Sequence, residues 1–143
     1  MANAENKTFN FELVSPERKL ISEPAVMVTI PGGEGDFGVL ANHSPLLSTI
    51  RAGVIEVVGE NDNEPRRLFV AGGFADVTPE NCTVLAEYAI NVADLDQAKI
   101  EKELTDLKED LAMAEGDQDK ARVQRKIDLA NAKLTAVTGE LQL

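Results

Sequence analysis

The sequence predicts an α+β protein with segregated parts, an N-terminal antiparallel β-sandwich followed by a C-terminal antiparallel two-helix hairpin. Two observations support this prediction. Up to about Tyr88, apolar residues alternate with polar ones, which is the period of half-buried strands. After about Val92, apolar residues recur every three or four positions, which is the period of an amphipathic helix. We therefore expect a sandwich domain over residues 1–90 and a helical domain over residues 91–143.

The strand-like segments are short and lie between turn sequences. In the first of them, Phe9, Phe11 and Leu13 share one face. The others are AVMVTI, GVIEVV, RRLFVAGG and CTVLAEY, separated by runs rich in Gly, Pro, Asn and Ser. Because no helical pattern separates these strands, an antiparallel sandwich or barrel is favoured. Gly72 and Gly73 interrupt one strand, where we expect a bulge or a close backbone approach.

Two apolar stripes define the helical hairpin. Their members are Ile100, Leu104, Leu107, Leu111 and Ala114 in the first stripe, and Val123, Ile127, Ala130, Leu134, Val137 and Leu141 in the second. We expect Asp94 to cap the first helix, with Gln97 completing a capping box. Gly116 is expected to end that helix in a left-handed conformation, and Asp117 to cap the next. A joint this short predicts antiparallel helices.

The segment PGGEGDFGVLANHSPL, residues 31–46, contains a nucleotide-binding spacing in an unsuitable context. The spacing G-x-G-x-x-G is formed by Gly33, Gly35 and Gly38. Glu34 and Asp36 would place carboxylates beside the phosphates, and Pro45 lies where a helix should continue. We expect instead a loop that needs positive φ at several glycines and exposes acidic groups and Phe37 at its tip. Such a loop on a sheet is typical of a contact surface.

The composition argues against several classes of function. A net charge of −11 argues against nucleic acid as a partner. No apolar run is long enough for a membrane span, so membrane association is expected only through another protein. The single His43 and single Cys82 do not suffice for a metal site. His43 is expected to be a hydrogen-bonded structural residue and Cys82 a small buried one, and we predict no catalytic residue, metal or cofactor.

Four ordered motifs extend this interpretation. They are VSPERKL at residues 14–20, PGGEGDFGVLANHSPL at 31–46, AGGFADV at 71–77 and VLAEYA at 84–89. In order and spacing they resemble the epsilon subunits of bacterial F-type ATP synthases, a family that corresponds to the mitochondrial delta subunit. The resemblance covers nearly the whole sequence. It implies a ten-stranded sandwich with a helical hairpin, and a non-catalytic subunit of the rotor's central stalk at the cytoplasmic face of the bacterial inner membrane.

The resemblance also implies partners and contact residues. The partners are the gamma subunit and the ring of c subunits, and the ring contact falls on the glycine-rich loop, here Glu34, Gly35, Asp36, Phe37 and His43. Two departures from the family pattern are Ala41, where proline is common, and Asp76, where glutamate is usual. We expect a slightly less rigid loop from the first and no effect from the second.

Some members of the family bind ATP between the helices through a motif I/L-D-x-x-R-A. Residues 118–123 align with it, so Asp119 and Arg122 are weak candidates for an ATP site. Both flanking apolar positions differ, and a later arginine of that ATP site falls on Leu129. These departures argue against nucleotide binding by this protein.

The charges of the hairpin are sorted, since its first segment is acidic and its second is basic. Opposite charges favour the closed hairpin, whereas an opened second helix would present Arg122, Arg125 and Lys126 to the beta subunits, as in inhibitory members of the family. We expect a rotor subunit that couples the ring to the gamma subunit, with a regulatory role for the tail. The alternatives are an ATP-sensing inhibitory regulator and, from another class, a stand-alone adaptor protein.

Overall fold

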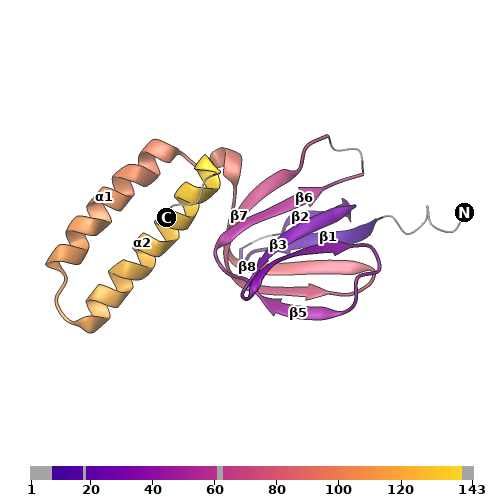
Figure 1. Cartoon of the computed structure of the whole chain (residues 1–143), viewed down its shortest axis with the longest axis horizontal. Helices are drawn as coiled ribbons and strands as arrows, with labels where there is room; N and C mark the ends of the chain where they lie inside the picture. The colour runs from indigo at the N-terminus through magenta and orange to yellow at the C-terminus, as the bar shows by residue number, and fades with distance from the viewer. Residues whose placement is uncertain (1–7, 18, 61–62, 140–143) are drawn as a thin grey trace, which may run out of the picture. The chain divides into compact units, whose positions relative to one another are not determined.

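A computed structural model describes residues 8–17, 19–60 and 63–139. The chain divides into two compact units, Met1–Ile90 and Asn91–Leu143 (Figure 1). The strands of the first unit are β1 (Phe9–Val14), β2 (Lys19–Ala25), β3 (Met27–Gly32), β4 (Gly35–Leu40), β5 (Leu46–Thr49), β6 (Gly53–Val58), β7 (Arg66–Val77) and β8 (Asn81–Asn91). The second unit contains the short 3₁₀ helix η2 (Val92–Asp94) and the helices α1 (Gln97–Met113) and α2 (Asp117–Thr138).

The strands form a curled, mostly antiparallel sheet in the order β2-β1-β8-β7-β6-β3-β4, with β5 paired to β7. This confirms the predicted α+β class, with a sandwich followed by a helical hairpin. The implied number of ten strands is wrong for the described residues, which form eight. One reason is that β7 and β8 are continuous strands of 12 and 11 residues. A second difference from the predicted antiparallel sandwich is that β1 and β8 pair in parallel. The two strands are far apart in sequence and run in the same direction.

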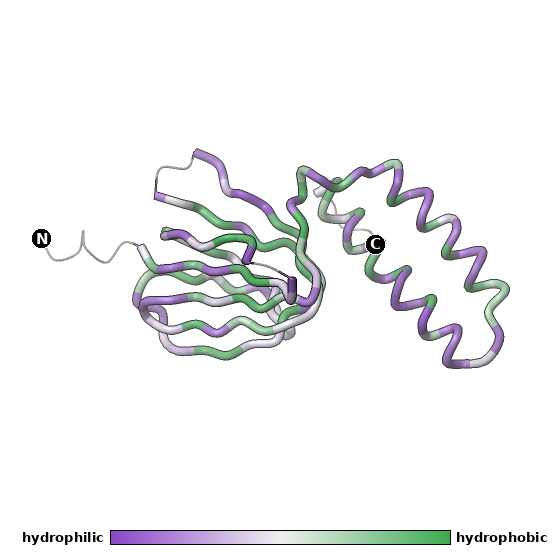
Figure 2. The backbone as a smooth tube through the Cα atoms, turned by 180° about the vertical axis from the view of Figure 1, so that it is seen from behind, coloured by the Kyte–Doolittle hydropathy of each residue, from purple (hydrophilic) through white to green (hydrophobic). Residues whose placement is uncertain are grey.

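The core of the first unit follows the alternation of the sequence. Phe9, Phe11 and Leu13 are all buried, as predicted for one face of the first strand. Buried residues alternate in the same way on β6, on β8 as far as Glu87, and on β3 as far as Ile30, after which Pro31 and Gly32 are buried as well. Figure 2 shows the two periods, with hydrophobic and hydrophilic residues alternating along the strands and hydrophobic residues recurring at helical spacing in the hairpin.

Strand β7 changes partners at its two glycines. Its first half pairs with β6, ending with Val70 opposite Gly53, and its second half pairs with β5, beginning with Phe74 opposite Thr49. Between these halves Gly72 and Gly73 have φ of 74° and 125°. A Cβ atom added to Gly73 would lie 1.9 Å from the carbonyl oxygen of Leu85. The predicted irregularity is therefore confirmed, and it lets one strand bend between two partners.

The helices α1 and α2 pack along the predicted apolar seam. The buried residues of the seam are Ile100, Leu104, Val123, Ile127 and Ala130, and the partly buried ones are Leu95, Leu107, Leu111, Leu134 and Val137. Leu141 lies outside the described residues. Burial of this seam is the main stabilising contribution that the structure shows for the hairpin.

The predicted helix ends are displaced. The N-cap of α1 is Asp96, whose carboxylate accepts hydrogen bonds from the amides of Ala98 and Lys99 at 3.0 and 3.3 Å. The expected cap Asp94 instead belongs to η2, which starts after Asn91. This 3₁₀ turn places the start of α1 two residues later than the capping-box pattern indicated.

The joint between the helices also differs from the prediction. Helix α1 ends at Met113 with an extended Ala114, so the apolar stripe outlasts the helix by one residue. Gly116 is the N-cap of α2, with φ 81° and ψ 154°, rather than a left-handed C-cap. Asp117 is the first residue of α2, where its charge is favourable near the helix N-terminus.

Replacement of Gly73 by alanine tests the bend of β7. We expect Gly73→Ala to lower the free energy of unfolding of the sandwich by about 3 kcal/mol, the upper end of the cost of one strained residue, because the new Cβ meets backbone atoms as well as an unfavourable φ. Urea unfolding followed by the emission of Tyr88, the single tyrosine in a sequence without tryptophan, measures the loss.

The matched control is Gly38→Ala, also in a strand. There the added Cβ would meet only the flexible end of Met27, at 3.1 Å from its Cε atom, and we expect a change within about 1 kcal/mol. Equal unfolding midpoints for the two variants would contradict the role assigned to the bend.

Candidate functional site

The first candidate surface is the acidic turn, which we define as residues 32–36, from the last residue of β3 to the second residue of β4. Gly32 pairs with Gly35, so Gly33 and Glu34 form a two-residue hairpin turn. Glu34 is exposed at its tip, and the Asp36 side chain, 62% exposed, follows as the second residue of β4. The segment is therefore a tight hairpin rather than the long loop expected from its glycines.

Only one glycine of this hairpin adopts a positive φ. Gly35 has φ 143°, whereas Gly33 and Gly38 do not enter the positive region. The prediction of several such positions was wrong, because most of the glycine-rich segment is β4. Position 33 favours glycine for a steric reason, since an added Cβ atom would lie 2.4 Å from the Oγ1 atom of Thr49.

The acidic turn is connected to the end of β5. The Gly33 amide donates to the Thr49 carbonyl at 2.9 Å, and the Arg51 amide donates to the Pro31 carbonyl at 3.0 Å. The guanidinium of Arg51 also donates to the Asp36 carboxylate in an ion pair. Backbone hydrogen bonds and an ion pair thus attach both arms of the hairpin to one neighbouring segment.

The other predicted loop residues lie elsewhere. Phe37 is half-buried and packs against the core of the sandwich, so its expected exposure at the tip is wrong. Phe37 on β4 pairs with the buried Ile30 on β3, so its side chain lies on the same, core-facing side of the two strands. His43 follows β4 at the end away from the turn, about 20 Å along the strand from Glu34. Its Nδ1 atom lies 2.7 Å from the Ser44 carbonyl oxygen, which confirms the predicted hydrogen-bonded histidine.

The second candidate surface is an apolar patch, defined as Leu47, Phe74 and Leu85, which are 71%, 53% and 52% exposed. Leu47 lies opposite Asp76, and Phe74 opposite Thr49, so these residues share the outward face of β5 and β7. Leu85 lies between the buried Val84 and Ala86 on β8, so its side chain points outward. Exposed apolar clusters with a polar rim are typical of protein interfaces.

The sequence alone did not identify the apolar patch, although it contains large apolar residues at outward strand positions. Phe74 and Leu85 occupy outward positions of segments already expected to be strands. Their adjacency depends on β7 pairing with both β5 and β8, which strand periodicity does not indicate. The carboxylates of Asp76 and Glu87 are exposed at neighbouring outward positions, so the patch has an acidic rim.

The hairpin places two of its candidate bases together. Arg122 forms an ion pair with Asp119 at 3.3 Å, one turn earlier in α2. Both residues line a shallow hollow of about 280 Å³ at the connected end of the helices, together with Lys126. Arg125 is exposed on α2 but does not line this hollow. The three predicted bases are therefore not one uniform patch, because Asp119 offsets the charge of Arg122.

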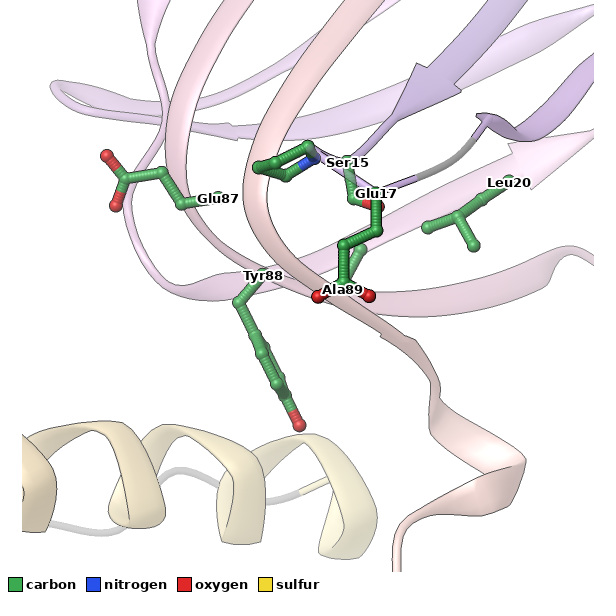
Figure 3. A pocket seen from close by; sticks show the side chains of 7 residues that line it. Ser15, Glu17, Leu20, Glu87, Tyr88 and Ala89 are labelled. Atoms are coloured by element: carbon green, nitrogen blue, oxygen red, sulfur yellow. The ribbon is translucent and has the colours of Figure 1, made fainter.

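A second hollow, of about 410 Å³, lies on the sandwich and is lined by Ser15, Pro16, Glu17, Leu20, Glu87, Tyr88 and Ala89 (Figure 3). Its two carboxylates point in different directions and do not converge on one point. The Tyr88 ring packs edge-to-face against Phe69, with ring centroids 6.0 Å apart. This hollow does not assemble the paired acid and base that general acid–base chemistry requires.

Cys82 is buried, as predicted, and burial raises the pKa of its thiol to about 12, with a further contribution from the charge of Asp76. A thiol in this state is a poor nucleophile near neutral pH. In the described part of the protein, no cluster of three or more potential metal ligands is found. The helices in that part are too short or too polar to cross a membrane.

Comparison with known protein families shows to which family the chain belongs. Residues 8–92 match the family model of the β-sandwich domain of the ATP synthase delta/epsilon chain, and residues 96–142 match that of the C-terminal domain of the ATP synthase epsilon chain. The protein belongs to the ATP synthase delta/epsilon family. This confirms the resemblance carried by the four sequence motifs. Delta/epsilon chains are non-catalytic subunits of the central stalk, so their function depends on contact surfaces.

Two relatives named ATP synthase epsilon chain illustrate the similarity. That of Rhodospirillum centenum is 45% identical over 134 residues, which cover 91% of this chain and 92% of the relative. That of Parvibaculum lavamentivorans is 49% identical over 120 residues, which cover 83% and 89%. Both delta/epsilon matches extend through the sandwich and into the hairpin.

Solved structures support the same fold. One subunit in the cryo-EM structure of the Euglena gracilis mitochondrial ATP synthase, OSCP/F1/c-ring in rotational state 1, has a TM-score of 0.81 at 21% identity, covering 92% of this protein and 82% of that subunit. Another, from the central stalk and c-ring of the Tetrahymena thermophila mitochondrial enzyme, has a TM-score of 0.57 at 11% identity, covering 89% and 96%. At these identities the likeness concerns the delta/epsilon fold alone.

Proposed function

We propose that this protein couples rotation of the c ring to the gamma subunit within the central stalk of an F-type ATP synthase. Within the bacterial enzyme, this role places it at the cytoplasmic face of the inner membrane, attached through its partners. The observation that carries the proposal is that one sandwich presents two different contact surfaces, the acidic turn and the apolar patch. A subunit that transmits torque needs two such attachments on a stiff body.

The acidic turn is assigned to the c ring. We expect Glu34, Gly35 and Asp36 to touch a polar partner, because they form the exposed end of the β3–β4 hairpin. Phe37 supports this contact from below by anchoring β4 in the core. His43 lies at the far end of β4, so it joins the contact only where the ring surface extends along that strand.

The apolar patch is assigned to the gamma subunit. Its three large side chains present the kind of surface that holds subunits together durably, and the rim of Asp76 and Glu87 selects a partner with basic residues around an apolar centre. A durable apolar contact suits a subunit that turns with the shaft. The polar acidic turn is less suited to that task.

Replacement of Gly35 by valine tests the ring contact. Valine at φ 143° strains the turn by about 1–3 kcal/mol, and its Cβ atom has no neighbouring atom within 4 Å, so we expect the effect to be on the shape of the turn. We expect ATP-driven proton pumping in membrane vesicles to fall at least about fivefold per ATP hydrolysed, while hydrolysis continues. The control Gly38→Val, at a position without positive φ, should keep most of the pumping. Normal pumping by the Gly35 variant in a fully assembled complex would contradict the proposed function.

Substitution of the apolar patch tests the gamma contact. Leu47→Ser combined with Phe74→Ser removes two exposed apolar side chains and leaves the core intact. We expect the affinity for purified gamma subunit to fall at least about tenfold, since full burial of one such residue is worth about 1.5–3 kcal/mol. Met113→Ser, at an apolar side chain that is 80% exposed on α1, serves as the control. Unchanged affinity in the double variant would exclude the patch as the gamma contact.

A regulatory role of the tail is a second proposed function, and the packing of the hairpin bears on its strength. Opening α2 exposes the apolar seam, at about 25 cal/mol for each Å² of apolar area. Of the candidate beta-subunit contacts, Arg125 and Lys126 are exposed, whereas Arg122 already pairs with Asp119. We infer that the closed hairpin dominates and that inhibition through the beta subunits is weak. The same ion pair occupies the two candidate ATP-binding residues, so we do not favour ATP sensing.

Removal of the tail after Gly116 tests this inference. We expect ATP hydrolysis by the assembled, detergent-free complex to rise less than tenfold, because the seam already keeps the tail closed. A larger rise, equivalent to more than about 1.4 kcal/mol of inhibitory bias, would show that the open tail is a major brake. Isothermal titration of the intact protein with ATP distinguishes the ATP-sensing alternative, and saturable heat of binding would favour it.

A further inference from the structure

We infer that Arg51 is a positioning residue of the acidic turn. Its ion pair with Asp36 holds the turn against the end of β5. Force applied at the turn is then transmitted to β5, the strand that carries Leu47. This inference rests on the proposed function, because it explains how the two contact surfaces act as one body. Arg51 lies two residues after β5 and at no position singled out by the sequence motifs.

Three connections join residues 49–51 to the hairpin. Two are the backbone hydrogen bonds from Gly33 to Thr49 and from Arg51 to Pro31, which together form the antiparallel bridge between Gly32 and Ile50. The third is the ion pair of Arg51 with Asp36. The two backbone bonds hold the β3 arm and the turn, and among these three connections only the ion pair reaches β4.

Strand β4 depends on such a side contact because of its place in the sheet. It is the terminal strand of the sheet path, and in the described structure it pairs with β3 alone. A strand paired on one side has little resistance to bending, and the turn before it contains Gly33 and Gly35. Arg51 therefore supplies the restraint on the strand that presents Asp36.

The exposure of the ion pair sets the size of the effect. The side chains of Arg51 and Asp36 are 47% and 62% exposed, so water and salt screen their attraction. An exposed pair shifts the population of the held turn by at most about fivefold. Arg51 thus changes the efficiency of coupling, whereas folding and assembly continue without it.

The experiment uses membrane vesicles with the complete ATP synthase and compares protons pumped per ATP hydrolysed. We expect Arg51→Gln to lower this ratio about two- to fivefold, with hydrolysis and the amount of bound gamma subunit unchanged. Arg51→Lys, which keeps the charge, should retain more than half of the ratio. The matched control is Arg67→Gln, which removes an arginine that is 40% exposed and paired with Glu56 at 3.4 Å on a different part of the sheet.

A disulfide tests whether attachment of the turn to β5 accounts for the effect of Arg51. A Cβ atom at Gly33 would lie 3.7 Å from the Cβ of Thr49, within the range of natural disulfides. Cys82 is buried and does not compete. We expect Gly33→Cys with Thr49→Cys, added to Arg51→Gln, to restore coupling when oxidised and to lose it again when reduced.

Each outcome decides one point. If Arg51→Gln pumps normally while Gly35→Val does not, the positioning role is overturned and the proposed function stands. If neither variant affects pumping, the proposed function fails as well. If Arg51→Gln uncouples and the oxidised disulfide forms without restoring pumping, attachment of the turn to β5 is not what Arg51 supplies, and the positioning role is overturned.

Amide exchange in the isolated protein provides an independent measurement. The Gly33 amide donates to Thr49, so its exchange reports the attachment of the turn to β5. We expect at least twofold faster exchange in Arg51→Gln and no change in Arg67→Gln. An unchanged rate at Gly33 in Arg51→Gln overturns the inference even where the disulfide variant fails to fold.

Discussion

The close approach of Gly73 to the Leu85 carbonyl is the constraint on which the rest of the sandwich depends. Only a residue without a side chain fits there, and its positive φ turns β7 away from β6 and toward β5. Without this bend, the short strand β5 would have no partner in the described sheet. The apolar patch takes Leu47 from β5, and the acidic turn is attached to the end of β5. Both surfaces therefore depend on one backbone contact, which is made beside Phe74 and Leu85 of the patch.

The two proposed contact surfaces differ in physical character, and this difference suits their tasks. The apolar patch offers area that releases water on burial, which favours a lasting attachment. The acidic turn offers carboxylates held by an exposed ion pair, which gives direction and electrostatic complementarity with little affinity. A subunit that holds the shaft firmly and meets the ring through polar groups requires both kinds of surface on one stiff support.

In the hairpin, packing outweighs charge. The apolar seam of Ile100, Leu104, Val123 and Ile127 buries residues that are each worth on the order of kilocalories, whereas the ion pair of Arg122 with Asp119 lies within a single helix and is exposed. Sorted charges therefore say less about closure than the sequence suggests. The start of α1 is likewise set by the local fold, because the η2 turn places the Asp96 carboxylate, and not that of Asp94, beside the free amides of α1.

The sequence by itself determined the order of the elements, the strand faces and the helical seam, because burial follows from local periodicity, as Phe9, Phe11 and Ile127 illustrate. Its motifs also determined the family. Only the tertiary structure decided that Phe37 is half-buried, that Gly33 is small because of Thr49, that Arg51 reaches Asp36 and that Leu47 lies beside Phe74. These features arise between segments that are distant in sequence. Local patterns specify which way a side chain faces, whereas pairing across the sheet specifies what it meets.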